Sequence, residues 1–204
     1  MTSEHLNVLA NFMMALAATA GAVAAFKGLN AWKSQSLWQS DNELARRVLI
    51  AIYRYRDTLY SVRHPVMANS EKQVEIESER KLSDGERRSQ GVINAYVHRW
   101  ERHYTKRNEL DALLIETDAV WGIDLSKSVA AVKQLEQDLY AYIWLYLDAN
   151  FRGNAQLAAQ YKILLRTKRD ILYDSLSEDD EYRKDFMRLL EPIECYLRTK
   201  LGRP

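Results

Sequence analysis

The sequence has 204 residues, enough for one domain with its own hydrophobic core and short for two. Its 29 basic and 28 acidic residues leave a net charge of +1, which gives no strong signal for nucleic-acid binding. Seven Gly and three Pro are too few for the many turns of a β-rich fold and instead favour long helices.

The first predicted element is a helix over residues 6–26, LNVLANFMMALAATAGAVAAF, a stretch without any formal charge. At about 1.5 Å per residue it is about 31 Å long, close to the hydrocarbon thickness of a bilayer. We therefore favour a transmembrane helix, with residues 1–5 as a short external tail. Two alternatives stay open. One is a secretory signal, for which the basic start is missing, and the other is a buried core helix.

Small and polar residues recur along this helix. Ala17, Gly21 and Ala25 are four residues apart, a spacing that lets two helix backbones approach closely in lipid. Asn7 and Asn11 lie one turn apart and suit a partner helix better than lipid. We expect copies of the chain to associate through these five residues, giving a homo-oligomer. The alternative is that the alanines only fill space.

Residues just after the uncharged stretch match a membrane–water interface. Lys27 ends the stretch, and Trp32, Lys33 and Trp38 follow it. Trp and Lys anchor at such an interface because each has an apolar body and a polar tip. These four side chains are the predicted interfacial anchor, and the lipid bilayer is the expected partner.

A juxtamembrane helix is predicted within residues 27–65, where apolar residues step by three or four from Leu44 to Val62. Asp41 can cap a separate helix, or the helix can continue unbroken from the span, and Pro65 ends it. Basic residues on this helix predict a juxtamembrane surface that binds anionic headgroups. In a ring of subunits the same residues could instead line a cytoplasmic vestibule. The other alternative is a solvated helix face whose arginines pair with acids. The basic residues are Arg46, Arg47, Arg54, Arg56 and Arg63.

Residues 66–90 are polar and crowded with both signs of charge, which is typical of a solvated linker or a frayed helix. Residues 91–204 are helical in pattern, with short breaks between the helical stretches. The expected fold is therefore all-α: a single N-terminal transmembrane helix followed by an antiparallel cytoplasmic bundle of four to five helices.

The predicted helices of this bundle have definite ends. Gly122 is the expected stop of the first, and the next should start at Ser126 or Ser128 and form the centre of the bundle. Two more are expected over 155–174 and 181–201, with a kink or restart at Pro192.

No metal, cofactor or catalytic motif stands out. The four His are scattered, no Glu-x-x-His occurs, and no Gly-rich phosphate loop is present, so we expect no cofactor and no enzyme activity. The nearest pattern is HRWERH, residues 98–103, whose Arg99 and His103 form a weak nuclease-like pair. Helical ribonucleases place four to six residues between Arg and His, whereas here there are three. We expect a solvated or partner-facing basic cluster instead.

Three segments carry a resemblance to a known family. Residues 43–67, 95–122 and 191–202 resemble a largely uncharacterised family of bacterial proteins of about this length. That resemblance implies an N-terminal span and a cytoplasmic helical part, and it brings no catalytic residues. In layout alone, the chain is also similar to the pore-forming membrane accessory of type VI CRISPR systems, an analogy of architecture.

Together these patterns predict a self-associating inner-membrane protein of bacteria. Basic residues follow the uncharged stretch and none precedes it, which places the N-terminus outside and the C-terminal part in the cytoplasm. The single Cys195, expected to be buried in a helix, fits a reducing compartment. The cytoplasmic part would sense or bind a partner, and the assembly would act as a pore-forming anti-phage effector. The alternatives are a membrane-tethered adaptor without conduction and a degenerate nuclease.

Overall fold

The computed structural model describes residues 3–73, 83–152 and 155–202, with side chains from residue 11 onward. Within these ranges every regular element is a helix and no strand occurs, which confirms the all-α class. The chain forms two compact units, Met1–Glu43 and Leu44–Pro204. The second unit is called the helical domain below.

The first helix, α1 (Ser3–Arg63), is unbroken and contributes residues to both units. Asp41 therefore starts no separate helix. Among the described residues, α1 is the one helix long and apolar enough to cross a membrane, and its most apolar stretch is not buried. Large apolar side chains are exposed along this part, with Phe12 at 62% and Trp32 at 67%. The expected long apolar N-terminal helix is thus confirmed.

The second long helix, α2 (Asp84–Trp121), has well-defined ends. At its start the Ser83 hydroxyl accepts from the Glu86 N–H at 3.3 Å, and the Glu86 carboxylate accepts from the Ser83 N–H at 2.9 Å. This reciprocal cap satisfies donors that the first turn leaves open. At its end Gly122 has φ +84 and donates to the Asp118 carbonyl, so the predicted stop is confirmed.

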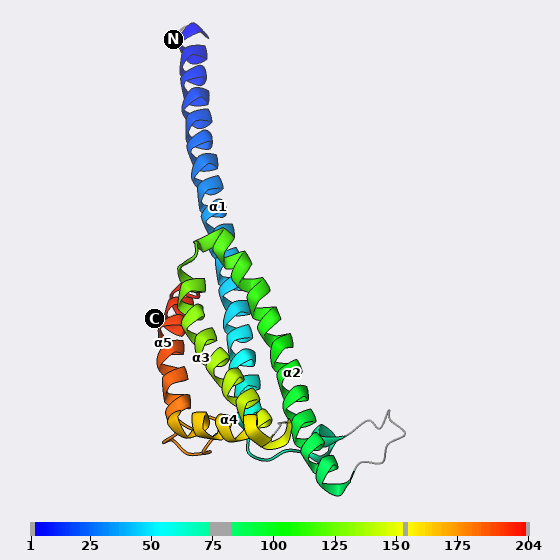
Figure 1. Ribbon diagram of the computed structural model, residues 1–204. Helices are drawn as coiled ribbons and strands as arrows, with labels where there is room; N and C mark the ends of the chain where they lie inside the picture. Colours follow the sequence, from blue (N-terminus) through cyan, green and yellow to red (C-terminus); the bar gives the residue numbers. More distant parts are fainter. Residues whose placement is uncertain (1–2, 74–82, 153–154, 203–204) are drawn as a thin grey trace. The chain divides into compact units, whose positions relative to one another are not determined.

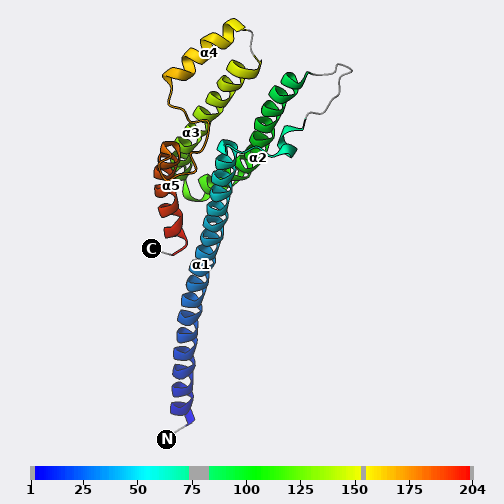
Figure 2. The ribbon, with the colours of Figure 1, turned by 90° about the horizontal axis from the view of Figure 1, so that it is seen from below.

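Two helices follow at short intervals. Helix α3 (Asp124–Leu147) begins at Asp124, before the expected Ser126 or Ser128, and continues as a π-helical turn, η2 (Asp148–Arg152). Helix α4 (Ala155–Thr167) lies beside the C-terminal part of α3 in both views (Figures 1 and 2). It ends seven residues before the expected 174, since the chain beyond it forms a loop.

That loop is built from aspartate-capped turns. The Asp170 carboxylate accepts from the Leu172 N–H at 3.0 Å, and the Asp174 carboxylate accepts from the Leu176 N–H at 2.8 Å. Such side-chain bonds to the backbone compete with helix formation. Helix α5 (Glu181–Lys200) then starts at Asp180, whose carboxylate accepts from the Arg183 N–H at 2.7 Å. Pro192 lies inside α5 without a restart of the helix.

One hydrophobic core holds the helical domain together. Figure 1 shows α2 and α5 beside α3, and the end of α1 shares the same core. The apolar residues predicted to repeat along the end of α1 all lie in this core. They are Leu44, Val48, Ile52, Tyr55, Leu59 and Val62.

Three sequence expectations differ from the structure. The expected juxtamembrane segment 27–65 does not stand apart, because Leu44 and the residues after it belong to the helical domain. The expected linker 66–90 includes a short 3-10 helix, η1 (Asn69–Lys72), and the first turns of α2. Cys195 is exposed rather than buried, since the core face of α5 is formed by its neighbours Ile193 and Leu197.

Candidate functional site: the apolar helix and three charged centres

The residues expected to associate spans are on the surface of α1. Asn11, Ala17, Gly21 and Ala25 are all exposed, and a Cβ added at Gly21 would meet no atom within 4 Å. The side chain of Asn7 lies outside the described residues. Nothing within the described part of the chain therefore explains the small size of these residues by packing.

The hydroxyl of Thr19 needs no water in this helix. It donates within its own helix to the carbonyls of Ala15 at 3.0 Å and Leu16 at 2.9 Å. Such bonds lower the cost of placing a hydroxyl in lipid.

The predicted interfacial residues Lys27, Trp32, Lys33 and Trp38 are likewise exposed on α1. They therefore have the accessibility that an interfacial anchor needs, and whether they meet lipid stays a prediction. The most apolar stretch and these flanking residues follow one another along a single helix.

Part of the predicted basic surface is paired to acids. Arg46, Arg47 and Arg54 are exposed. Arg47 pairs with Glu116 of α2 at 2.6 Å. The half-buried Arg56 pairs with Asp57 at 2.8 Å and lies over the ring of Tyr53. Arg47 and Arg56 are thus paired to acids, as the solvated-face alternative expects.

Arg63 is a clear exception among these arginines, because its side chain is only 1% exposed. Its guanidinium donates to both carboxylate oxygens of Asp180, at 2.8 and 2.9 Å. It also donates to the carbonyls of Ile171 at 2.8 Å and Tyr173 at 2.7 Å, and it lies over the ring of Tyr182. The expectation that Arg63 meets headgroups was wrong, since all of these partners are within the helical domain.

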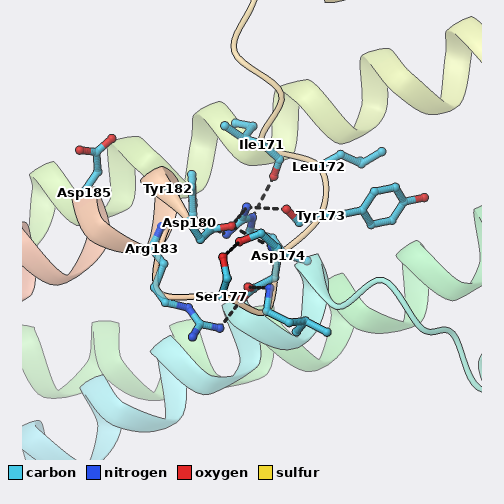
Figure 3. Close-up of polar contacts among 12 residues, drawn as sticks. Ile171, Leu172, Tyr173, Asp174, Ser177, Asp180, Tyr182, Arg183 and Asp185 are labelled. Atoms are coloured by element: carbon cyan, nitrogen blue, oxygen red, sulfur yellow. Dashed lines mark hydrogen bonds and ion pairs between the residues drawn. The ribbon is translucent and has the colours of Figure 1, made fainter.

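Figure 3 shows the loop side of this Arg63 centre, where the Asp174 carboxylate accepts from the Arg183 guanidinium. Burial alone would raise the pKa of Asp180, but the hydrogen bonds from Arg63 and from the backbone N–H groups of Arg183 and Ser175 lower it to about 2. Asp180 is therefore ionised at neutral pH. A buried charge with this many donors is stable only while its partners stay in place.

A second centre lies around Glu136 of α3, which is 2% exposed. Its carboxylate accepts from the Tyr55 hydroxyl of α1 at 2.8 Å and from Arg107 of α2 at 3.1 Å. The Nε2 of His103 lies 3.2 Å from the same carboxylate, and its Nδ1 lies 3.1 Å from the Thr58 hydroxyl. Burial opposes ionisation of Glu136, yet the adjacent His103 ring and the hydrogen bond from Tyr55 lower its pKa. This Glu136 centre joins three helices.

A third centre holds the segment after α1. Arg99 of α2 is 3% exposed and donates to the carbonyls of His64 and Val66, each at 2.6 Å, and to Glu71 at 3.0 Å. Burial raises the pKa of Glu71, but the bonds from Arg99 and Arg102 outweigh it and lower the pKa to about 2. This Arg99 centre therefore fixes residues 64–71 against α2.

The nuclease-like pair is thus not one site. Arg99 faces the turn after α1, whereas His103 faces Glu136, and within the described ranges no hydrogen bond or ion pair joins the two. The expectation of a solvated or partner-facing cluster was also wrong for these two residues, because both are buried. Among the described residues, no group of three or more His, Cys, Asp or Glu could hold a metal ion.

Sequence reasoning missed Glu136, Asp180 and Glu71 as central residues. A signal was present for Glu136, which continues the apolar series Val132, Leu139 and Ile143 at helical spacing. A charge at such a position must be buried with partners. No comparable signal marks Asp180 or Glu71, because each is one of several acids in a polar segment.

No family model, curated protein or solved structure matches the chain. The resemblance to a bacterial family therefore stays a prediction, and the residues themselves carry the functional argument.

Proposed function

We propose that this protein is a single-pass membrane protein of the bacterial inner membrane. In this proposal the apolar part of α1 crosses the bilayer, the N-terminus lies outside, and the helical domain folds as an antiparallel bundle in the cytoplasm, where it binds a partner. The span also associates with copies of itself.

One observation carries this proposal: the most apolar stretch of α1 is exposed along its length. Covering one large apolar side chain contributes about 1.5–3 kcal/mol, and α1 presents many, including Phe12, Met13, Phe26 and Leu29. If α1 were a core helix of a protein in water, the fold would bury these side chains. Lipid or another copy of the helix provides the missing cover.

The exposed small residues support self-association. Ala17, Gly21 and Ala25 recur every fourth residue and are exposed, and a Cβ added at Gly21 would meet no atom within 4 Å. In lipid, close approach of two backbones at such residues is what stabilises a helix pair. Span contact and anchoring are thus two roles of one helix.

Two experiments test this proposal. The chain should stay with the membrane fraction after an alkaline carbonate wash and leave it only with detergent. In detergent, Gly21→Leu should shift the particle to a smaller mass by light scattering, because the larger side chain separates the backbones. Val23→Phe is the matched control, since it adds bulk about 200° round the helix from Gly21. A water-soluble monomer from cells would contradict anchoring, and an unchanged mass for Gly21→Leu would contradict the span contact.

A second version of this function, the adaptor without conduction, is favoured by the three charged centres. Arg63, Glu136 and Arg99 are each bonded to several partners on other elements, which suits a domain that keeps one shape. A pore-forming effector, by contrast, must change the assembly when triggered. Dye-filled liposomes separate the two versions. The effector releases dye when the protein assembles in them, and the adaptor releases none.

A further inference from the structure

A hollow on the helical domain lies between α3, α4 and the loop before α5. Its volume is about 550 Å³, within the range of small-molecule sites, which is about 300–1,000 Å³. The residues around it come from these three elements and from η2. They are Tyr142, Tyr146, Asn150, Lys162, Leu165, Arg166, Lys168, Asp170, Leu172 and Tyr173.

Positive charge is concentrated at this hollow. Lys162 and Arg166 come from α4 and Lys168 from the loop, against the single acid Asp170. Within the described ranges, no ion pair involves any of these three basic side chains, whereas Arg169 next to them pairs with Asp185 at 2.9 Å. Three unpaired cations around one hollow attract an anion with several oxygens, and a phosphate has that chemistry.

The rest of the wall is aromatic and apolar. Tyr142, Tyr146 and Tyr173 line it together with Leu165 and Leu172. Burial, with the neighbouring Asp170, raises the pKa of Tyr142 to about 12. Burial, with the neighbouring Tyr173, likewise raises the pKa of Tyr146 to about 12. Both hydroxyls are therefore neutral in the cell and do not repel an anion. Aromatic walls of this kind hold a planar ring.

The two sides of the hollow differ in how firmly they are held. The backbone of Tyr173 is fixed by its bond from Arg63, and in Figure 3 its ring points away from the Asp174 and Arg183 contacts. On the other side, α4 has no fully buried residue. A ligand in the hollow would touch both sides and tie α4 to the rest of the domain.

We propose that this hollow is a nucleotide-binding site, in which Lys162, Arg166 and Lys168 hold the phosphates and the tyrosine-lined wall holds the base. The site is separate from the apolar part of α1. The helical domain would thus bind a small molecule, in addition to the membrane role proposed for α1.

The test uses the full chain in detergent micelles and calorimetric titration with ADP, GDP, CDP and UDP, alongside pyrophosphate and adenosine. At least one nucleoside diphosphate should bind more tightly than pyrophosphate and adenosine. Lys162→Glu and Lys168→Glu should each weaken that binding about tenfold or more, because each removes a charge-assisted contact. Lys127→Glu is the matched control, since Lys127 is an exposed lysine of α3 away from the hollow and should bind as the parent does.

Hydrogen exchange gives an independent readout. The bound nucleotide should slow exchange in α4, and it should not do so in Lys168→Glu. Three results would overturn the proposal: no nucleotide binding up to about 1 mM, equal binding by Lys168→Glu, or pyrophosphate binding as tightly as every nucleotide. None of these depends on whether α1 enters a membrane, so failure here is distinguishable from failure of the anchoring proposal.

Discussion

Arg63 and Asp180 form a buried, bidentate ion pair. The pair joins the last residue of α1 to the residue that caps α5, 117 positions further along the chain. Four bonds from one guanidinium end on this acid and on two loop carbonyls. The loop between α4 and α5 thus owes its position to one side chain of α1.

Replacing Arg63 should destabilise the helical domain strongly. Arg63→Ala leaves the Asp180 carboxylate buried without its counter-charge, and breaking such a pair costs about 3–5 kcal/mol. The free energy of unfolding, from urea titration followed by circular dichroism, measures this. Arg188→Ala is the control, because Arg188 is also an arginine paired to an acid but is 73% exposed, and it should change stability by less than about 1 kcal/mol. Equal stability of the two variants would contradict the role given to Arg63.

The stability of the domain should fall at acid pH. The pKa values of Asp180 and Glu71 are about 2 in the folded protein, below their ordinary 3.8 and 4.5. Protons therefore bind the unfolded chain first, so the stabilisation is complete above about pH 5 and is lost as pH falls from there to about 2. Each group contributes about 2–3 kcal/mol. Unfolding free energies measured from pH 7 to pH 2 check this.

The Glu71→Gln variant isolates one of these two groups. It should be less stable than the parent at pH 7 and should lose less stability on acidification, because it has no proton to take up at this position. A pH profile with the same slope as the parent would show that Glu71 is not among the groups responsible.

Glu136 should behave as a shared acceptor rather than as an ordinary core residue. Glu136→Leu leaves Arg107, His103 and the Tyr55 hydroxyl without their common partner, and we expect a loss of about 3–5 kcal/mol. Tyr55→Phe removes one bond and should cost about 1 kcal/mol. Gln137→Leu is the matched control on the exposed side of α3 and should be nearly neutral. A stable Glu136→Leu protein would mean that the three helices do not depend on this carboxylate.

The single cysteine reports the proposed orientation. Cys195 is exposed on α5, so a membrane-impermeant maleimide should label it in inverted membrane vesicles and leave it unlabelled in intact spheroplasts. Ser3→Cys in a Cys195→Ser background should show the opposite pattern. Labelling of Cys195 from outside the cell would reverse the orientation, and labelling in both preparations would contradict insertion.

The helical class and most helix ends were predictable because they depend on local signals. Gly122 ends α2 and Asp180 begins α5 through bonds to residues three or four positions away. The apolar spacing from Leu44 to Val62 also identified the core side of α1. Such patterns need only the neighbouring sequence.

Apart from Glu136, whose place in an apolar series is a local signal, the charged centres and the hollow were not predictable in the same way. In the sequence, nothing distinguishes Arg63 from the exposed arginines before it. It can be buried because its partner Asp180 lies 117 residues further along the chain. The early end of α4 has a related cause, since Asp170 and Asp174 bond to the backbone and replace the helix that the composition favours. Pairing between distant segments carries no local signature.

The long separation between Arg63 and Asp180 also sets an order of events during synthesis. A ribosome that adds about 5–20 residues per second needs about 6–23 seconds to pass from one to the other. Throughout that interval the guanidinium lacks the Asp180 carboxylate, while the apolar part of α1 has already been synthesised. The apolar part of α1 is therefore complete well before the loop that surrounds Arg63 exists.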